Sequence, residues 1–389
     1  MNANSIEFSM FLIFTGAAVL ATVALFARQA MLVAYILLGI ILGPWGLGLV
    51  NDPGLIQDIS NIGIIFLLFL LGLDLLPRQL MQMLGEALSA TLVSSLVFFG
   101  FGFAVGHGFG FSVYESLVMG IALMFSSTII GVKLMPTTSL HHRHTGQMII
   151  SVLLIQDLMA IIVLLLLQGY GKGGNLLMDT LWQIGTLPVL IFVAWALERF
   201  VLLRLIIKFD QIHEYIFLLA IAWCLGIAEL AAAMGLSHEI GAFVGGVTLA
   251  SSPIAYFITE KLKPLRDFFL VIFFFSLGAS FNIDVIGDIL APALLLAAFV
   301  IVIKPLVFGK LFVWVGENRG VSLEVGFRLG QISEFSLLIA VLAVKSSFIS
   351  QTVSYLIQLA TLITFIISSY IIVLRYPTPI AVSDKLRRD

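Results

Sequence analysis

Apolar runs of membrane-spanning length follow one another along almost the whole chain. Residues 148–167, for example, are long enough to cross a bilayer as one helix, which takes about 20 apolar residues. Hydrophobic residues make up 60% of the sequence and charged residues 11%, with a mean hydropathy of +1.13. Soluble domains, in contrast, have about 25% charged residues. Because the bilayer core offers the backbone no hydrogen-bonding partner, these runs predict an all-α polytopic membrane protein.

The apolar runs, and the polar, glycine and proline residues that separate them, predict about 13 transmembrane helices. They are expected near residues 7–27, 31–49, 59–77, 86–107, 114–135, 147–168, 179–201, 213–234, 238–257, 265–281, 288–315, 321–345 and 352–374. Lys and Arg gather on one set of alternate loops and the helix ends beside them, whereas the other set holds only Lys172 and Lys345. Since cytoplasmic loops are enriched in basic residues, the N-terminus is expected outside and the C-terminus in the cytoplasm.

Thirteen spans divide into six, one and six, so the sequence is compatible with two inverted six-helix repeats around a linking helix. The fifth helix of each repeat then contains residues that favour a break: Ser126, Ser127 and Thr128 followed by Gly131 in one, and residues 330–334 in the other. Two broken helices that cross would aim positive helix ends and free carbonyls at a common point. The alternative is that the hydroxyls bond to the preceding turn and the glycines only permit close packing.

Asp157 and Lys304 are ionisable side chains inside long apolar segments. A carboxylate at mid-bilayer costs roughly 2.5–3.5 kcal/mol on insertion, so it is a functional-site candidate by default. Burial disfavours its charged form, and Asp157 could then hold either a proton or a cation but not both. If the protein moves only when this charge is neutralised, protons and cations cross in opposite directions. Lys304 is either a fixed counter-charge to Asp157 or another acid, which we favour, or a second proton carrier.

The predicted site collects polar residues from both breaks around this acid. Its cation- and proton-binding residues, with the monovalent cation at the carboxylate, are Asp157, Gln156, Ser126, Ser127 and Thr128, and its supporting residues are Lys304, Gln331, Ser333 and Glu334. Glu334 could line the cation path or accept the N–H groups that the break frees, and both interpretations stay open. Arg328 and Glu324 are expected to pair at the cytoplasmic rim.

No motif of an enzyme is present: the sequence has no His-Glu-x-x-His helix, phosphate-binding glycine loop or nucleophile elbow. The single cysteine, Cys224, excludes a disulfide within the chain and a Cys-rich metal site. Two other classes remain as alternatives to a cation antiporter. One is an organic-anion symporter of the same fold, and the other is a membrane sensor or channel module.

Six short segments resemble landmarks of the monovalent cation:proton antiporter superfamily, and in particular its Kef-type potassium efflux branch. They are SSTII at 126–130, QDL at 156–158, GAFVGG at 241–246, PLRDFF at 264–269, IKP at 303–305 and GQISEF at 330–335. The resemblance implies that Asp157 is the ion-binding carboxylate and Lys304 the membrane lysine. Gln156 matches Kef-like members, whereas sodium exchangers commonly have Asp or Asn there. The implied activity is electroneutral exchange of potassium for protons by alternating access, with sodium/proton exchange as the alternative.

The resemblance also implies an assembly and a location. It predicts a homodimer in the bilayer of a bacterial inner membrane, with moving core helices at about 86–168 and 288–374. Dimerisation helices would lie at about 7–77 and 213–281, with the linker helix at 179–201.

Kef-type proteins continue into a cytosolic nucleotide-binding domain. Residues 375–389 are therefore interpreted as a cytoplasmic tail or the start of a linker to such a domain. Potassium or sodium and the proton are expected as substrates, with no cofactor in this chain; a nucleotide would bind only to a missing regulatory domain. A regulatory domain or ancillary subunit is a possible partner, and nucleic acid is not. The segment 251–263, read as a loop, lacks the acidic motif of glutathione-gated members.

Overall fold

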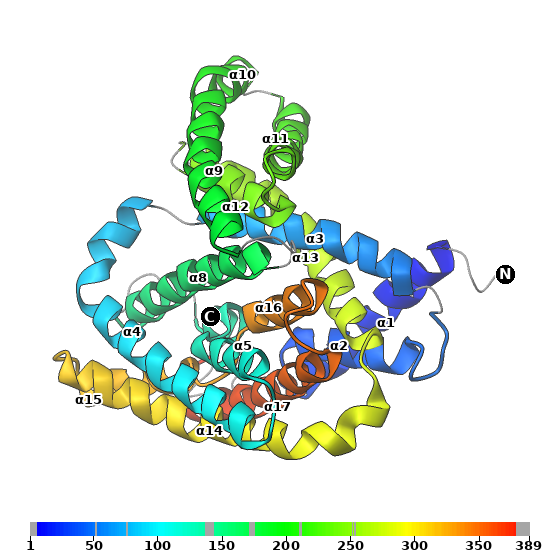
Figure 1. Ribbon diagram of the computed structural model, residues 1–389, viewed down its shortest axis with the longest axis vertical. Helices are drawn as coiled ribbons and strands as arrows, with labels where there is room; N and C mark the ends of the chain where they lie inside the picture. Colours follow the sequence, from blue (N-terminus) through cyan, green and yellow to red (C-terminus); the bar gives the residue numbers. More distant parts are fainter. Residues whose placement is uncertain are drawn as a thin grey trace. The chain divides into compact units, whose positions relative to one another are not determined.

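The computed structural model describes residues 6–50, 53–74, 77–136, 144–170, 176–209, 212–250, 252 and 254–378. Helices dominate these ranges and no β-strand occurs in them (Figure 1), which confirms the all-α fold. Within the described residues, seven segments are long and apolar enough to cross a membrane, and two shorter apolar helices accompany them. The chain is thus a multi-pass membrane protein. The predicted number of 13 spans stays a prediction.

The chain divides into two compact units. Unit 1 comprises Met1–Ala18, Tyr35–Met81 and Gln168–Ser280, and unit 2 comprises Val19–Ala34, Gln82–Leu167 and Phe281–Asp389. Each unit is therefore assembled from segments that are far apart in the sequence.

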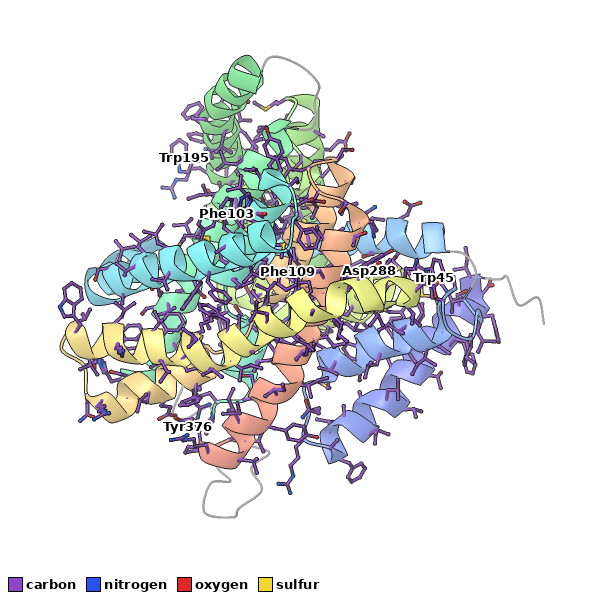
Figure 2. The ribbon with its side chains drawn as sticks, turned by 60° about the horizontal axis from the view of Figure 1, so that its bottom comes forward. Trp45, Phe103, Phe109, Trp195, Asp288 and Tyr376 are labelled. Atoms are coloured by element: carbon purple, nitrogen blue, oxygen red, sulfur yellow. The ribbon has the colours of Figure 1, made fainter. Side chains whose placement is uncertain are left out.

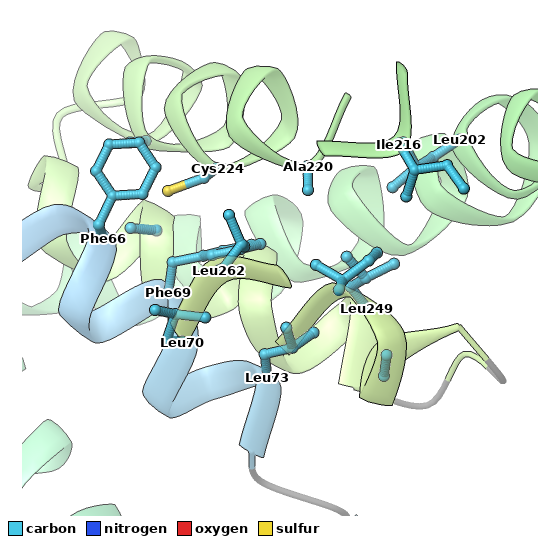
Figure 3. Close-up of a cluster of buried hydrophobic side chains, with 14 of the residues drawn as sticks. Phe66, Phe69, Leu70, Leu73, Leu202, Ile216, Ala220, Cys224, Leu249 and Leu262 are labelled. Atoms are coloured by element: carbon cyan, nitrogen blue, oxygen red, sulfur yellow. The ribbon is translucent and has the colours of Figure 1, made fainter. Parts of the chain in front are cut away.

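Unit 1 contains most of the helices of the chain's first quarter and middle. They are α1 (Ile6–Phe26) and α2 (Met31–Leu42), both shared with unit 2, α3 (Pro53–Asp74), α9 (Leu176–Leu197), the π-helical turn η1 (Glu198–Leu202), α10 (Leu203–Lys208), α11 (His213–Ala233), α12 (His238–Ala250) and α13 (Ala255–Ala279). Helices α3 and α12 approach so closely that a Cβ atom on Gly246 would overlap the carbonyl oxygen of Phe69. A buried apolar cluster fills the space between α3, α11, α12 and α13; Figure 3 shows Cys224 within it. The cysteine is buried and free, as expected for a packing residue.

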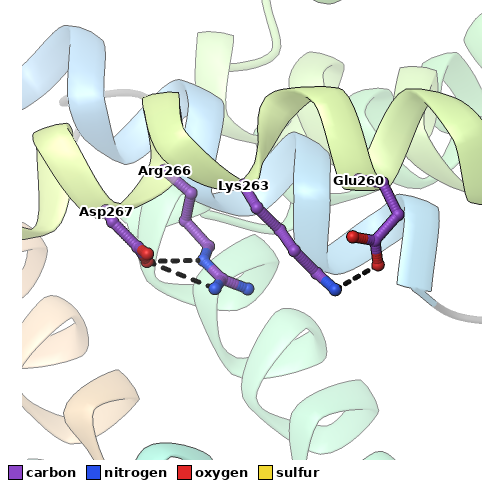
Figure 4. Close-up of polar contacts among 4 residues, drawn as sticks. All are labelled: Glu260, Lys263, Arg266 and Asp267. Carbon is purple, nitrogen blue, oxygen red and sulfur yellow. Dashed lines mark hydrogen bonds and ion pairs between the residues drawn. The ribbon is translucent and has the colours of Figure 1, made fainter.

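The predicted loop at 251–263 is wrong over most of its length, because α13 already begins at Ala255. Its charged residues lie on exposed turns of this helix. Lys263 donates to Glu260 one turn earlier, and Arg266 contacts Asp267 at 3.2 Å (Figure 4). Side chains three apart on a helix face each other, so the first pair supports the helix rather than a loop.

Unit 2 contains the remaining helices. They are α4 (Pro77–Gly108), α5 (Val113–Met124), α6 (Thr128–Lys133), α8 (His144–Tyr170), the 3-10 turn η2 (Ile283–Val285), α14 (Ile286–Trp314), α15 (Arg319–Arg328), α16 (Glu334–Lys345) and α17 (Gln351–Arg375). Helices α4 and α14 lie side by side (Figures 1 and 2), and ring contacts join Phe98 and Phe101 of α4 to Phe299 and Phe308 of α14. The two predicted interruptions are confirmed: α5 and α6 are separated by three residues, 125–127, and α15 and α16 by five, 329–333.

Candidate functional site

At the first break, the chain leaves α5 at Phe125 in an extended conformation and re-enters a helix at Ser127, the N-cap of α6. The Ser127 hydroxyl accepts from the backbone N–H of Ile130 at 3.2 Å. Gln156 of α8 spans the gap. Its Oε1 accepts from the N–H of Ser126 at 2.9 Å, and its Nε2 donates to the carbonyl of Met124 at 3.0 Å. The buried amide thus replaces backbone partners that the break removes.

This geometry refines the expected role of Gln156. We predicted that it adds a neutral oxygen ligand for a cation. The oxygen already accepts one hydrogen bond, which leaves one lone pair for a ligand. The amide is first of all a support for the extended segment.

At the second break, side chains from α17 serve the corresponding purpose. The N–H of Ile332 donates to Thr364 Oγ1 at 3.2 Å, and Ser368 Oγ donates to Gln331 Oε1 at 3.0 Å. Gln331 Nε2 donates in turn to the carbonyls of Arg328 at 2.9 Å and Ser127 at 3.3 Å. Gln331 therefore joins the second break to the first.

Lys304 of α14 lies fully buried between the two breaks, with 0% exposure. Its Nζ donates to the carbonyl oxygens of Phe125 at 2.7 Å and Gln331 at 3.0 Å, and it lies 5.1 Å from the centre of the Phe98 ring. Both carbonyls follow the C-terminal end of a half-helix, where the helix dipole is negative. The Nζ thus serves two helix ends at once, a pair of partners that the sequence did not predict. The predicted counter-charge to Asp157 or another acid stays a prediction.

Glu334 occupies the complementary position at the helix N-termini. It is the first residue of α16, and its Oε1 accepts from the N–H of Ile129 in the first turn of α6 at 3.2 Å. Of the two interpretations left open for Glu334, this contact shows that one carboxylate oxygen accepts a freed backbone donor. The positive ends of α6 and α16 also favour a negative charge there.

Three buried oxygen atoms at the breaks have no hydrogen-bond partner among the described residues: Ser126 Oγ, Thr128 Oγ1 and Glu334 Oε2. A buried polar atom without a partner costs about 1–3 kcal/mol, so each needs an explanation such as a bound ion. Asp157 is 4% exposed and follows Gln156, whose amide bonds to Ser126. A carboxylate and neutral oxygens are ligands suited to a desolvated monovalent cation.

The structure adds polar residues that the sequence patterns did not single out. Ser336 Oγ donates to the carbonyl of Ala122 at 2.6 Å, which joins α16 to α5. Thr364 and Ser368 belong to a buried polar stripe along α17, whose spacing of three or four residues was a readable signal. The predicted pairing of Arg328 with Glu324 is confirmed at 2.9 Å, but Arg328 is 1% exposed and so is no rim residue.

The chain is similar to known membrane transporters. A family model described as sodium/hydrogen exchanger, transmembrane, matches residues 11–374. Over 344 residues the chain is 26% identical to the iron transporter MagA of Paramagnetospirillum magneticum, covering 88% of this chain and 79% of that protein. Over 326 residues it is 31% identical to K(+) efflux antiporter 4 of Arabidopsis thaliana, covering 80% of this chain. The chain spans about half, 54%, of the plant protein's length.

The fold is also similar to that of solved structures. The sodium proton antiporter MjNhaP1 from Methanocaldococcus jannaschii at pH 8 matches with a TM-score of 0.68 and 18% identity, covering 94% of this chain and 95% of that one. An electron-microscopy map of the same antiporter gives a TM-score of 0.63 at 16% identity, covering 94% and 93%. These likenesses show a shared fold. Together with the sequence matches, they confirm the predicted superfamily and the resemblance to the potassium efflux branch.

Proposed function

Because the chain belongs to the family of transmembrane sodium/hydrogen exchangers, we propose that it exchanges potassium for protons across the membrane by alternating access. Asp157 is the shared binding group in this proposal. The observation that supports it most is that three buried oxygens at the two helix breaks have no partner among the described residues, and that the first break is bonded to Gln156, the neighbour of Asp157. Oxygens left without partners are suited to a cation that has shed its water.

The exchange cycle needs one titratable carboxylate. Asp157 binds a cation on one side of the membrane, and the neutralised unit moves. The cation leaves on the other side, a proton takes its place, and the unit returns. Lys304 is held by two carbonyls, Glu334 accepts from the N–H of Ile129 and Gln156 is neutral, so none of the three has to carry charge in the cycle. One charge then crosses in each direction, and the exchange is electroneutral.

Potassium is the proposed cation, with sodium as the second candidate. The hydroxyl oxygens of Ser126 and Thr128 are neutral ligands, and neutral ligands favour the ion that is cheaper to dehydrate. The name of the Arabidopsis relative agrees with potassium, whereas that of the solved MjNhaP1 agrees with sodium. The name of MagA makes iron a further ion to include in the assay.

We further propose that unit 2 is the moving core and unit 1 the static part of a homodimer. Both breaks, Asp157 and Lys304 belong to unit 2, so its movement would carry the whole site. We also propose that the chain lies in a bacterial inner membrane, with its N-terminus outside and its C-terminus in the cytoplasm.

Proton flux in proteoliposomes tests the function. The purified chain is reconstituted with a pH-sensitive dye inside, and potassium, sodium, lithium or ferrous chloride is added outside. Potassium is expected to drive the largest proton movement. Equal movement with sodium would replace potassium by the sodium alternative, and no cation-driven proton movement would overturn the antiporter proposal.

A further inference from the structure

Arg328, the last residue of α15, is a buried arginine whose guanidinium group holds three separate parts of unit 2 together. Its Nε donates to Glu324 on its own helix at 2.9 Å. Its Nη1 donates to the carbonyl of Leu134 at 3.1 Å, and its Nη2 donates to the carbonyl of Pro377 at 2.8 Å. All three donating nitrogens are thus engaged, in the planar fork that only arginine provides.

Two of these partners connect the guanidinium to distant segments. Leu134 is the C-cap of α6, the half-helix that follows the first break. Pro377 lies just beyond α17, in a segment that docks on the end of α15. The ring of Tyr376, labelled in Figure 2, lies 5.6 Å from the guanidinium carbon of Arg328 and 6.1 Å from the ring of Phe327.

The opposite end of α6 belongs to the candidate cation site. With six residues, α6 is about 9 Å long, so a shift of its C-terminus is carried to its N-terminus. That N-terminus presents Thr128 Oγ1, which has no partner in the part of the chain that the structure describes, and the N–H of Ile129, which donates to Glu334. The backbone carbonyl of Arg328 also accepts from Gln331, which bridges the two breaks.

We propose that Arg328 is a positioning residue that couples the segment after α17, residues 376–378, to the cation site through α6. This inference rests on the proposed exchange function. The docked segment orients the guanidinium, the guanidinium holds the end of α6, and α6 sets the position of the site oxygens at its start. A displacement of residues 376–378 is then transmitted to the affinity for the cation.

The test compares Arg328→Lys with Glu324→Gln as its matched control, in the full chain. Lysine keeps the charge but cannot serve three acceptors in different directions, whereas Glu324→Gln leaves both carbonyl contacts in place. Arg328→Lys is expected to raise the KM for potassium in proteoliposomes by about two- to tenfold. Hydrogen–deuterium exchange of peptides covering 128–135 is expected to increase with it. The control should leave both close to the parent values.

A second pair addresses the docked segment without touching the arginine. Tyr376→Ala should raise the KM in the same direction, and Tyr376→Phe, which keeps the ring, should not. An unchanged KM and unchanged deuterium uptake in Arg328→Lys would overturn the coupling, and so would equal effects in Glu324→Gln. If Arg328→Lys does not fold, an unchanged KM in Tyr376→Ala overturns it. Absence of exchange in the parent protein would refute the proposed function instead, and the deuterium comparison would still decide whether Arg328 holds α6.

Discussion

At the scale of single residues, Lys304 and Glu334 form hydrogen bonds at opposite helix ends. Lys304 donates to carbonyls beyond the C-termini of α5 and α15, and Glu334 accepts from the N-terminal turn of α6. A buried polar group is costly unless hydrogen bonds satisfy it, and here the broken helices supply those bonds. The two side chains and the breaks therefore stabilise each other.

Asp157→Asn should abolish exchange and leave the protein folded. Asparagine keeps the shape and hydrogen-bonding capacity of the side chain but cannot take up and release the coupled proton. The thermal stability of the variant should rise, because the desolvation cost of a buried charge disappears. Cation-driven proton flux and thermal unfolding of the purified variant measure both effects, with the exposed Asp267→Asn as the control. Normal flux in Asp157→Asn would refute the assignment.

Lys304→Met should destabilise the protein by about 2–4 kcal/mol, because the buried carbonyls of Phe125 and Gln331 each lose their donor. Lys310→Met on the exposed face of the same helix is the control, and it should change stability by less than about 0.5 kcal/mol. Thermal unfolding in detergent compares the two. Equal stability of both variants would show that the buried contacts contribute nothing.

At the scale of elements, each break is supported by side chains of a later helix, α8 for the first break and α17 for the second. Gln156 of α8 closes the gap after α5, and Thr364 and Ser368 of α17 serve the gap after α15. Irregular backbone at membrane depth is tolerated only where protein or a cavity satisfies it. The two breaks use different residues for this same purpose.

Gln156→Leu should lower the free energy of unfolding by about 2–4 kcal/mol, since it leaves the carbonyl of Met124 and the N–H of Ser126 without partners. Gln147→Leu, on the exposed face of α8, is the matched control. Thermal unfolding of the two variants gives the comparison. A smaller loss in Gln156→Leu than in the control would contradict the supporting role of the amide.

The contact between α3 and α12 gives a second prediction at this scale. Gly246→Ala should destabilise unit 1 by about 1–3 kcal/mol, because its Cβ would overlap the Phe69 carbonyl and force the helices apart. Gly226→Ala on α11 has no described atom within 4 Å of its Cβ, and it should stabilise its helix by about 0.5–1 kcal/mol. Unfolding temperatures shifted in opposite directions are expected. A shift in the same direction would argue against the close contact.

At the scale of the whole molecule, the proposed cycle predicts how much net charge crosses the membrane. The proposed cycle exchanges one cation for one proton at one carboxylate, while Lys304 stays bound to carbonyls. Potassium-driven proton movement should therefore be almost unchanged when the membrane potential is clamped. Electrical recording on a solid-supported membrane is the measurement. A transient current that scales with the potassium gradient would show that a second charge moves.

Local features could be predicted from the amino-acid sequence: which segments are apolar enough to be helices, and where short polar residues and glycine interrupt two of them. Hydropathy and backbone preference act over a few residues, so these features could be read directly, as could the family landmarks around Asp157. The role of that residue as the ion-binding group stays a prediction. The hydrogen-bond partners of the buried polar groups, in contrast, can be identified only from the folded structure. Lys304 and Phe125 are 179 positions apart, and Arg328 and Leu134 are 194 apart. No local pattern specifies such pairs, because they form only when the packed helices bring a free carbonyl next to a buried basic side chain.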